Sequence, residues 1–330
     1  MSEVSGSHFH LTVHHLKFTL ETKNLIHFGP QAGAQIRGAL WQALQQFACS
    51  DHTASGQPGH SENCPMCRLM ALETATGARG ITPARPFAIQ PPLAEYPQQD
   101  RFYQTGEPFT IGISLFGDAA GIFPYVCQAV HRVGQIGIGY GRGQFTLLRV
   151  QAANPLTGEV QDLLQGRQII ATPGLPVTDD MISQVAQSLP GNTIALHFLT
   201  PTQITGDQGR LSSGPDFEKL IARLLERCQS LEFHYTDQPT PQPIWRDRYL
   251  SLTARARHVR VVRDNTRWIK VRSGSRRTGG NSPLSGFVGD VLYEGEFSEF
   301  HEWLLWGQVL HLGKNAVKGN GWYKIISPRS

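Results

Sequence analysis

Long hydrophobic runs are missing from this sequence of 330 residues. No uninterrupted apolar stretch approaches the roughly 20 residues that a helix needs to cross a bilayer. The first residues, MSEVSGSHFHLTVHH, also lack the basic start and apolar core of a secretory signal. We therefore expect a cytoplasmic protein with no membrane partner.

Cysteine is scarce as well. Five cysteines, an odd number in a chain of this length, do not suit a disulfide framework, so we expect a reducing compartment. Hydrophobic residues make up 40% of the chain, which excludes a disordered protein, while 34 glycines and 21 prolines indicate a loop-rich one. A length of 330 residues predicts one large or two medium domains, and we expect two.

Three of the five cysteines lie close together in the sequence. Cys64 and Cys67 form the segment CPMC, a spacing that suits a metal ion better than a disulfide, and Cys49 precedes them. A closed structural zinc site has four ligands, and His60 or His52 would supply the fourth; we choose His60. The alternative is a set of buried or solvent-facing thiols without a metal. Two further cysteines fall in helical patterns and are expected in the core: Cys127 and Cys228.

Acidic residues are depleted in one part of the chain. The formal net charge is only +4, but residues 241–330 contain 15 Lys and Arg against 7 Asp and Glu. Between Arg246 and Arg277 there are eleven cations and two acids, which is the distribution expected of a surface that contacts phosphates. A merely solubilising face, the alternative, would normally mix both signs.

The segment ARHVRVVRDNTRWIKVRS within this region alternates like a β-hairpin, with Asp264 and Asn265 as its turn. The many cations of one hairpin cannot all point inward, so some of them must line a track for phosphates. The cations concerned are Arg255, Arg257, Arg260, Arg263, Arg267, Lys270 and Arg272.

Strand and helix patterns recur in both halves of the chain. HFHLTVHHLKFTLE predicts a strand with a bulge at His14 and His15, and AQIRGALWQALQQFAC predicts a helix. Each half continues to the order strand, helix, strands, helix, strand, which is that of a ferredoxin-like unit. We predict an α+β protein of two tandem ferredoxin-like (RRM-like) domains. Its parts are residues 1–152 with a cysteine-bearing insertion at about 48–100, a connector at 153–190, and a domain at 191–330.

Neither glycine-rich segment carries a complete nucleotide-binding motif. GQIGIGYGRG has no register that matches G-x-G-x-x-G, and GKNAVKGNG does not place a lysine and a hydroxyl residue after its second glycine. A Rossmann and a Walker site are thereby excluded. The second segment still predicts a loop whose backbone N–H groups approach phosphates beside Lys314 and Lys318. The alternative is a tight glycine turn before an edge strand. The glycines of this loop are Gly313, Gly319 and Gly321.

Several segments, taken in order, resemble a known family. SGFVGDVLYEGEF and LLWGQVLHLGKNAVKGNGWYKI, with VRSGSRR before them, resemble the C-terminal signature of the CRISPR-associated RAMP endoribonucleases that process precursor CRISPR RNA. IRGALWQALQQFAC with CPMC resembles the family's N-terminal helix and cysteine-bearing insertion, and GQIGIGYGRGQFTLLRV the end of its first ferredoxin-like unit. The resemblance implies one cut per RNA repeat without a metal. The upstream 2′-OH would attack the scissile phosphate, leaving a 2′,3′-cyclic phosphate and a free 5′-OH.

The same resemblance implies which residues carry the reaction. In this family the general acid or base is often a histidine near the loop between the first strand and first helix, and His27 is the only histidine there. Histidine titrates near neutral pH, which suits proton transfer, and Lys23 or Arg37 would stabilise the developing phosphorane charge. The alternative for His27 is an exposed or capping histidine, and His14 and His15 are the next candidates.

RNA binding is expected along the basic hairpin, at Arg276 and Arg277, and at the glycine-rich loop. The partners implied are the precursor CRISPR RNA repeat and other CRISPR effector-complex subunits. No cofactor is expected for catalysis, and zinc is expected only as a structural ion. Two other functions stay open: a non-catalytic RAMP subunit that caps a guide RNA, and a zinc-stabilised protein-interaction module with no RNA role.

Overall fold

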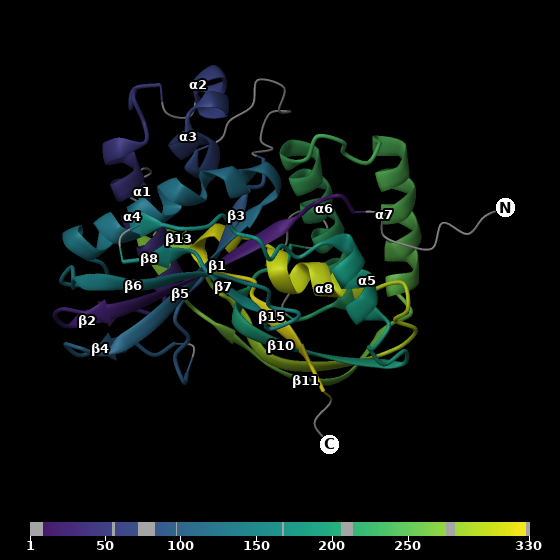
Figure 1. Ribbon diagram of the computed structural model, residues 1–330. Helices are drawn as coiled ribbons and strands as arrows, with labels where there is room; N and C mark the ends of the chain where they lie inside the picture. The colour runs from purple at the N-terminus through teal and green to yellow at the C-terminus, as the bar shows by residue number, and fades with distance from the viewer. Residues whose placement is uncertain are drawn as a thin grey trace. The chain divides into compact units, whose positions relative to one another are not determined.

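The computed structural model of the protein describes residues 9–54, 57–71, 83–96, 98–166, 168–205, 214–274 and 281–327. The chain forms two compact units, each built on an antiparallel sheet with helices packed against it (Figure 1). The N-terminal unit contains Val13–Pro176 and Val317–Gly319. The C-terminal unit contains Val177–Ala316, Asn320–Ser330 and the described part of Met1–Thr12.

The N-terminal unit has a five-stranded sheet with the strand order β3-β5-β1-β6-β7. Because helices follow β1 and β5 in the chain, its first four strands and two helices have the β-α-β-β-α-β order and the sheet order of a ferredoxin-like fold. The strands are β1 (Val13–Thr22), β3 (Phe87–Gln90), β5 (Pro108–Phe116), β6 (Phe145–Ala153) and β7 (Val160–Asp162). The helices are α1 (Ala32–Phe47) and α4 (Phe123–Ile136), the latter preceded by η1 (Gly117–Ile122).

Strand β1 shows how the apolar pattern forms this core. Leu16, Phe18 and Leu20 are buried on the helix-covered face, while Lys17 and Glu21 on the other face are exposed. The predicted bulge at the strand's two adjacent histidines is wrong, because pairing with β5 runs without interruption from Val13 to Glu21. A bulge would let the apolar residues change from one face of the strand to the other. The apolar residues before Val13 belong to the C-terminal unit instead, so no such change is needed within β1. The only register shift of β1 in the described pairings, between Thr19 and Leu20, is against β6.

Smaller elements complete the N-terminal unit. The cysteine-bearing insertion contains α2 (Pro58–Asn63) and α3 (Pro65–Met70). Two ribbons flank the sheet: β2 (Ile26–Phe28) with β4 (Arg101–Tyr103), and β8 (Leu164–Gln165) with β9 (Gln168–Ile169).

The C-terminal unit repeats the same topology. Its four-stranded sheet has the order β11-β14-β10-β15, and α6 and α8 follow its first and third strands in the chain. None of the described helices combines the length and the hydropathy needed to cross a membrane. The strands are β10 (Thr193–Thr202), β11 (Arg260–Ile269), β14 (Gly286–Glu294) and β15 (Tyr323–Ile326), with a ribbon of β12 (Arg272–Gly274) and β13 (Asn281–Pro283). The helices are α5 (Asp179–Ala186), α6 (Phe217–Tyr235), α7 (Gln242–Ala256) and α8 (His301–Leu310), and the short 3-10 helix η3 (Ala316–Lys318) follows α8 where the chain passes into the N-terminal unit.

The predicted basic hairpin is wrong. The segment begins at the last residue of α7, and both arms of the predicted hairpin lie largely in β11, a single strand in which Asp264 and Asn265 are in the middle. Strand β14 offers β11 a partner along its whole length, from Glu294 opposite Arg260 to Gly286 opposite Ile269. This pairing outweighs the turn preference of Asp-Asn, whose remaining local trace is a pair of hydrogen bonds from the N–H and hydroxyl of Thr266 to the Asp264 carboxylate.

Candidate functional site

His27 is held by three segments of the N-terminal unit. It lies in β2 opposite Phe102 of β4, and its carbonyl accepts a hydrogen bond of 2.8 Å from the N–H of Tyr140. Tyr140 belongs to the glycine-rich run that the sequence excluded as a Rossmann motif. Gly139 in that run has a φ of +76°, and a Cβ there would lie 2.4 Å from the His27 carbonyl oxygen. The glycine is therefore required for this close approach.

The His27 side chain is bracketed by an acid and two aromatic rings. Its Nε2 lies 2.6 Å from Oδ2 of Asp100. The imidazole stacks on Phe102 with ring centroids 4.3 Å apart and meets the edge of Tyr140 at 4.9 Å. The His27 side chain is 28% exposed, so a substrate can reach it. Because a carboxylate only accepts hydrogen bonds, this contact favours the tautomer that carries its proton on Nε2, with Nδ1 as the acceptor nitrogen.

Sequence reasoning missed Asp100, Phe102 and Tyr140. Asp100 comes 73 residues after His27 in a proline-rich stretch, and no spacing rule connects the two. The dense glycines around Tyr140 were the one available signal, since they indicate a backbone that packs closely against something.

Arg37 and Lys318 lie together in a second environment of the same unit. Burial lowers the pKa of Lys318, and the positive charge of Arg37 lowers that pKa further. Arg37 Nη2 also donates to the carbonyl of Met70 at 3.4 Å. A Cβ on Gly33, in the first turn of α1, would lie only 2.1 Å from the Lys318 carbonyl oxygen, so the loop packs directly on the helix. The predicted catalytic Arg37 thus neighbours a predicted RNA-binding lysine, about 280 residues away in sequence.

Lys23 follows β1 at a bend, where its N–H donates to the Gln144 carbonyl at 2.9 Å and its side chain is exposed.

The glycine-rich loop is tied into the protein rather than open. The N–H groups of Lys314, Asn320 and Gly321 donate to the carbonyls of Gln203, Asn315 and Pro201. The expectation that the loop's N–H groups face phosphates is therefore wrong for these three amides. Its glycines serve close packing: all three have positive φ, and a Cβ on Gly321 would lie 1.8 Å from the Leu312 carbonyl oxygen. The remaining predicted residues, Gly313, Lys314 and Gly319, flank η3, and the Lys314 side chain is exposed.

Several cations of the predicted phosphate track have acidic partners in the chain. Arg257 Nε donates to Glu218 at 2.8 Å, Arg255 pairs with Glu299, and Arg260 lies 3.6 Å from Glu294. Exposed ion pairs of this kind are weak, so they leave these arginines able to exchange a carboxylate for a phosphate. Arg263, Arg267 and Lys270 are exposed, and Arg272 lies in β12. Arg276 and Arg277 fall outside the described residues.

The predicted metal ligands come together. Cys49 follows α1, His60 lies in α2, Cys64 joins α2 to α3, and Cys67 lies in α3. Their ligand atoms are all within 4.8 Å of one another, with Cys49 Sγ 3.4 Å from His60 Nε2 and 3.9 Å from Cys67 Sγ. Tetrahedral zinc bonds of about 2.3 Å to sulfur and about 2.0 Å to nitrogen require S–S and S–N separations of roughly 3.8 and 3.5 Å. The four residues therefore fit a zinc ion.

The other cysteines and the alternative ligand are elsewhere. His52 is exposed, and it is not among the residues that gather at this cluster. Cys127 and Cys228 are buried in α4 and α6, as predicted, and burial raises the pKa of Cys127 to about 12. Both are inert core thiols.

The alternative catalytic histidines are less accessible to RNA: His15 is buried and His14 is partly buried. The His15 side chain is buried, and its Nδ1 lies 3.1 Å from Ser114 Oγ. Burial lowers the pKa of His15 from 6.5 to about 4, with a smaller contribution from Lys17. Burial also lowers the pKa of His14. A histidine that resists protonation and lies inside the sheet is poorly suited to exchange protons with RNA.

The pKa of His15 predicts acid sensitivity of the fold. Between pH 6.5 and about 4 the unfolded chain binds a proton at this position that the folded protein excludes, so the free energy of unfolding falls as the pH drops through this window. The shift corresponds to about 3 kcal/mol. Urea unfolding at pH 7 and pH 4.5 should show a smaller acid loss for His15→Gln than for the parent. Equal losses in the two proteins would contradict the prediction.

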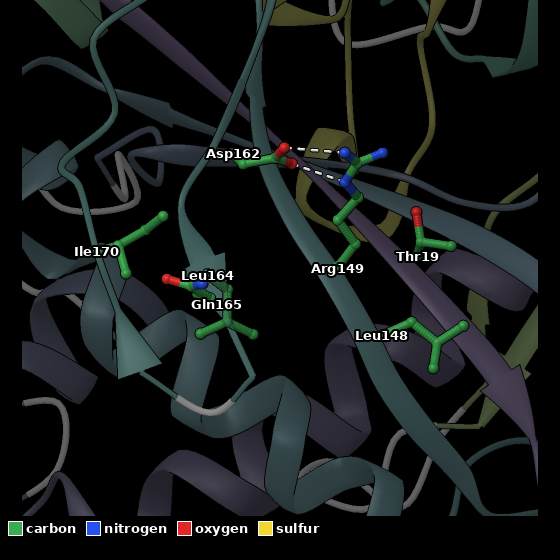
Figure 2. Close-up of a pocket in the computed structure, with 7 residues that line it drawn as sticks. All are labelled: Thr19, Leu148, Arg149, Asp162, Leu164, Gln165 and Ile170. Carbon is green, nitrogen blue, oxygen red and sulfur yellow. Dashed lines mark hydrogen bonds and ion pairs between the residues drawn. The ribbon is translucent and has the colours of Figure 1, made fainter.

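A groove of about 640 Å³ lies on the exposed face of the N-terminal sheet (Figure 2). Arg149 makes two hydrogen bonds with Asp162 there, of 2.7 and 2.8 Å, so the cation is already neutralised. The rest of the groove is lined by Thr19, Leu148, Leu164, Gln165 and Ile170.

Comparison with known proteins finds a matching protein family for each of the two units. Residues 11–175 match the AF_1859_N family of N-terminal domains, and residues 196–323 match the family of the CRISPR-associated endoribonuclease Cas6. No curated protein matches the chain.

Solved structures of Cas6 proteins have the same fold. A Cas6 product complex is similar over 95% of this chain and 100% of its own, with a TM-score of 0.55 and 17% identity. Thermus thermophilus Cas6 is similar over 96% of this chain and 99% of its own, with a TM-score of 0.53 and 14% identity. A chain of a partial Cas6-RT-Cas1-Cas2 complex is similar over 96% of this chain and 46% of its own, with a TM-score of 0.56 and 11% identity. The chain thus carries an AF_1859_N domain at residues 11–175 and a domain of the CRISPR-associated endoribonuclease Cas6 family at residues 196–323, and with its tandem ferredoxin-like units these matches support a CRISPR-associated RNA-processing protein.

Proposed function

We propose that the protein cuts precursor CRISPR RNA within its repeats, by attack of a 2′-OH on the adjacent phosphate, to give a 2′,3′-cyclic phosphate and a 5′-OH. The observation that carries this proposal is the contact of 2.6 Å between His27 Nε2 and Asp100 Oδ2. A partly exposed imidazole oriented by a carboxylate is a group suited to move a proton.

His27 acts as the general acid or base through Nδ1. Asp100 is a positioning residue that holds the imidazole in one orientation and one tautomer. Phe102 and Tyr140 support the ring on two sides, and both are exposed enough to stack on a base next to the cut.

The developing negative charge on the phosphorane needs a cation nearby. Arg37 and Lys318 are two such cations held close together, and Lys23 is a third with an exposed side chain. We assign Arg37 and Lys318 jointly to the RNA phosphates, because like charges placed side by side favour an anion between them.

The chemistry uses no metal in this proposal, and zinc has a structural part. Cys49, His60, Cys64 and Cys67 would hold one zinc ion that joins the end of α1 to α2 and α3. All four protein ligands are then used, so no position on the ion is left for water or substrate. The partners we propose are the precursor CRISPR RNA repeat and other CRISPR proteins, as in the Cas6-RT-Cas1-Cas2 complex.

The test is cleavage of the repeat RNA encoded beside the gene. The purified protein, incubated with that RNA in EDTA, should yield one discrete cut per repeat whose upstream fragment ends in a cyclic phosphate. Zinc analysis of the same sample shows whether the structural ion stays in place during the assay. Tight binding without a cut would contradict the proposal and favour the guide-capping RAMP subunit. Absence of binding at low salt would exclude an RNA role.

A further inference from the structure

The C-terminal sheet has one covered and one exposed face. On the covered face, Tyr293 of β14 packs its ring against Phe217 of α6, and Tyr323 of β15 donates a hydrogen bond to the Leu304 carbonyl of α8. Both tyrosines are fully buried. Because side chains alternate along a strand, the residues next to each tyrosine point to the opposite face.

A row of polar side chains crosses that opposite face. Lys324 lies opposite His197, His197 opposite Asp290, and Asp290 opposite Asn265, so the row spans all four strands. Lys324 and Asn265 are exposed, and the side chains of His197 and Asp290 are 40% and 35% exposed. The row therefore offers hydrogen-bonding groups to a ligand that lies across the sheet.

The charge of this face is positive. Arg263 and Arg267 lie two residues to either side of Asn265 in β11, so they share its face, and both are exposed. The two acids of β14 on this face have partners, since Asp290 pairs with His197 and Glu294 pairs with Arg260.

The N-terminal sheet provides a comparison within the same protein. Its exposed face carries the groove of Figure 2, where Arg149 is bound to Asp162 and the surroundings are largely apolar. The two units thus share a topology but have different exposed sheet faces. Among the described residues of these two faces, several exposed cations lie beside polar groups only on the C-terminal sheet.

We propose that the exposed face of the C-terminal sheet binds a single-stranded part of the RNA. Arg267 and Lys324 contact the phosphates from the two edge strands, while Asn265 and the His197–Asp290 pair face the bases between them. The hydrogen-bonding edges of bases are accessible in unpaired RNA and not to side chains in a helix, which favours a single strand. This inference rests on the proposed function, because it assigns the surface to the same RNA.

The test measures binding separately from cleavage. The probe is a labelled single-stranded oligonucleotide of the repeat sequence, titrated by fluorescence anisotropy at several salt concentrations. For the double variant Arg267→Gln/Lys324→Gln we expect about tenfold weaker binding and a slope of log affinity against log salt that is smaller by about 1.4, or 0.7 per lost contact. The charge-preserving pair Arg267→Lys/Lys324→Arg should keep the parent slope.

The matched control removes two cations from the covered side of the sheet. Lys219 and Arg223 lie on α6, where each pairs with a carboxylate of the same helical region. The double variant Lys219→Gln/Arg223→Gln should bind as the parent does, and matching melting temperatures show that all variants are folded. Parent-like affinity and slope in Arg267→Gln/Lys324→Gln would overturn the inference. Failure of the parent to cut repeat RNA would instead count against the proposed function, because the anisotropy result does not depend on cleavage.

Discussion

Replacing His27 with alanine is expected to slow cleavage of repeat RNA by about 10²- to 10⁴-fold, the usual contribution of a general acid or base. The loss should appear in the single-turnover rate at saturating RNA, since the imidazole acts on the proton rather than on the bulk of the RNA. The dissociation constant for the repeat RNA should change little, because the cations that hold phosphates are untouched.

Asp100→Asn separates positioning from proton transfer. An amide can accept a hydrogen bond from Nε2–H but can also donate one, so it no longer holds the imidazole in a single tautomer. We expect a rate between those of the parent and His27→Ala, with a shifted pH–rate profile that a purely structural role would not produce. His131→Ala is the matched control, because His131 is outside this site on α4. Parent-like cleavage by His27→Ala would remove His27 from the reaction.

Loss of the zinc ion is expected to have the largest effect on stability. The protein prepared without chelators should contain one zinc per chain, measured by elemental analysis. Cys67→Ser removes a fully buried ligand and should abolish stoichiometric zinc and lower the melting temperature of the N-terminal unit by at least about 5 °C. The binding free energy of a four-ligand zinc site is on the order of 10 kcal/mol, and in such a site it contributes directly to folding.

Cys127→Ser distinguishes loss of metal from loss of a buried thiol. Cys127 is buried in α4 outside the cluster, so its replacement should lower stability and leave the zinc content unchanged. His52→Ala should alter neither, whereas His60→Ala should reduce zinc content. A parent protein free of zinc, or Cys67→Ser with a full zinc complement, would exclude the site.

The sequence was sufficient to predict a helix or strand wherever the local residue pattern agreed with the tertiary environment of that segment. The alternation of FTIGISLFG became β5 and the helical spacing of AQIRGALWQALQQF became α1, because in each the apolar positions of the pattern are buried in the folded unit. The repeated strand and helix order was enough to predict two ferredoxin-like units, and the motifs from Arg272 to Ile325 were enough to indicate the family.

The local residue pattern predicted the wrong structure where contacts with a segment distant in sequence decided the conformation. Asp264 and Asn265 favour a turn, yet β11 extends through both of them as one strand because β14 pairs with it on either side of them. The glycines near the C-terminus suggested a loop that is open to phosphates, but several of them are required by carbonyl groups that lie too close for a Cβ.

By itself, then, the sequence determined the α+β class, the tandem architecture, the family resemblance and part of the set of residues able to do chemistry, since these depend on residue type and spacing. It did not point to Asp100, Phe102 or Tyr140, which surround His27. Tertiary structure decided which of those residues meet. It joined His27 to Asp100, Arg37 to Lys318, and His60 rather than His52 to three cysteines, because each pairing depends on chain segments that only the folded backbone brings within a few ångströms.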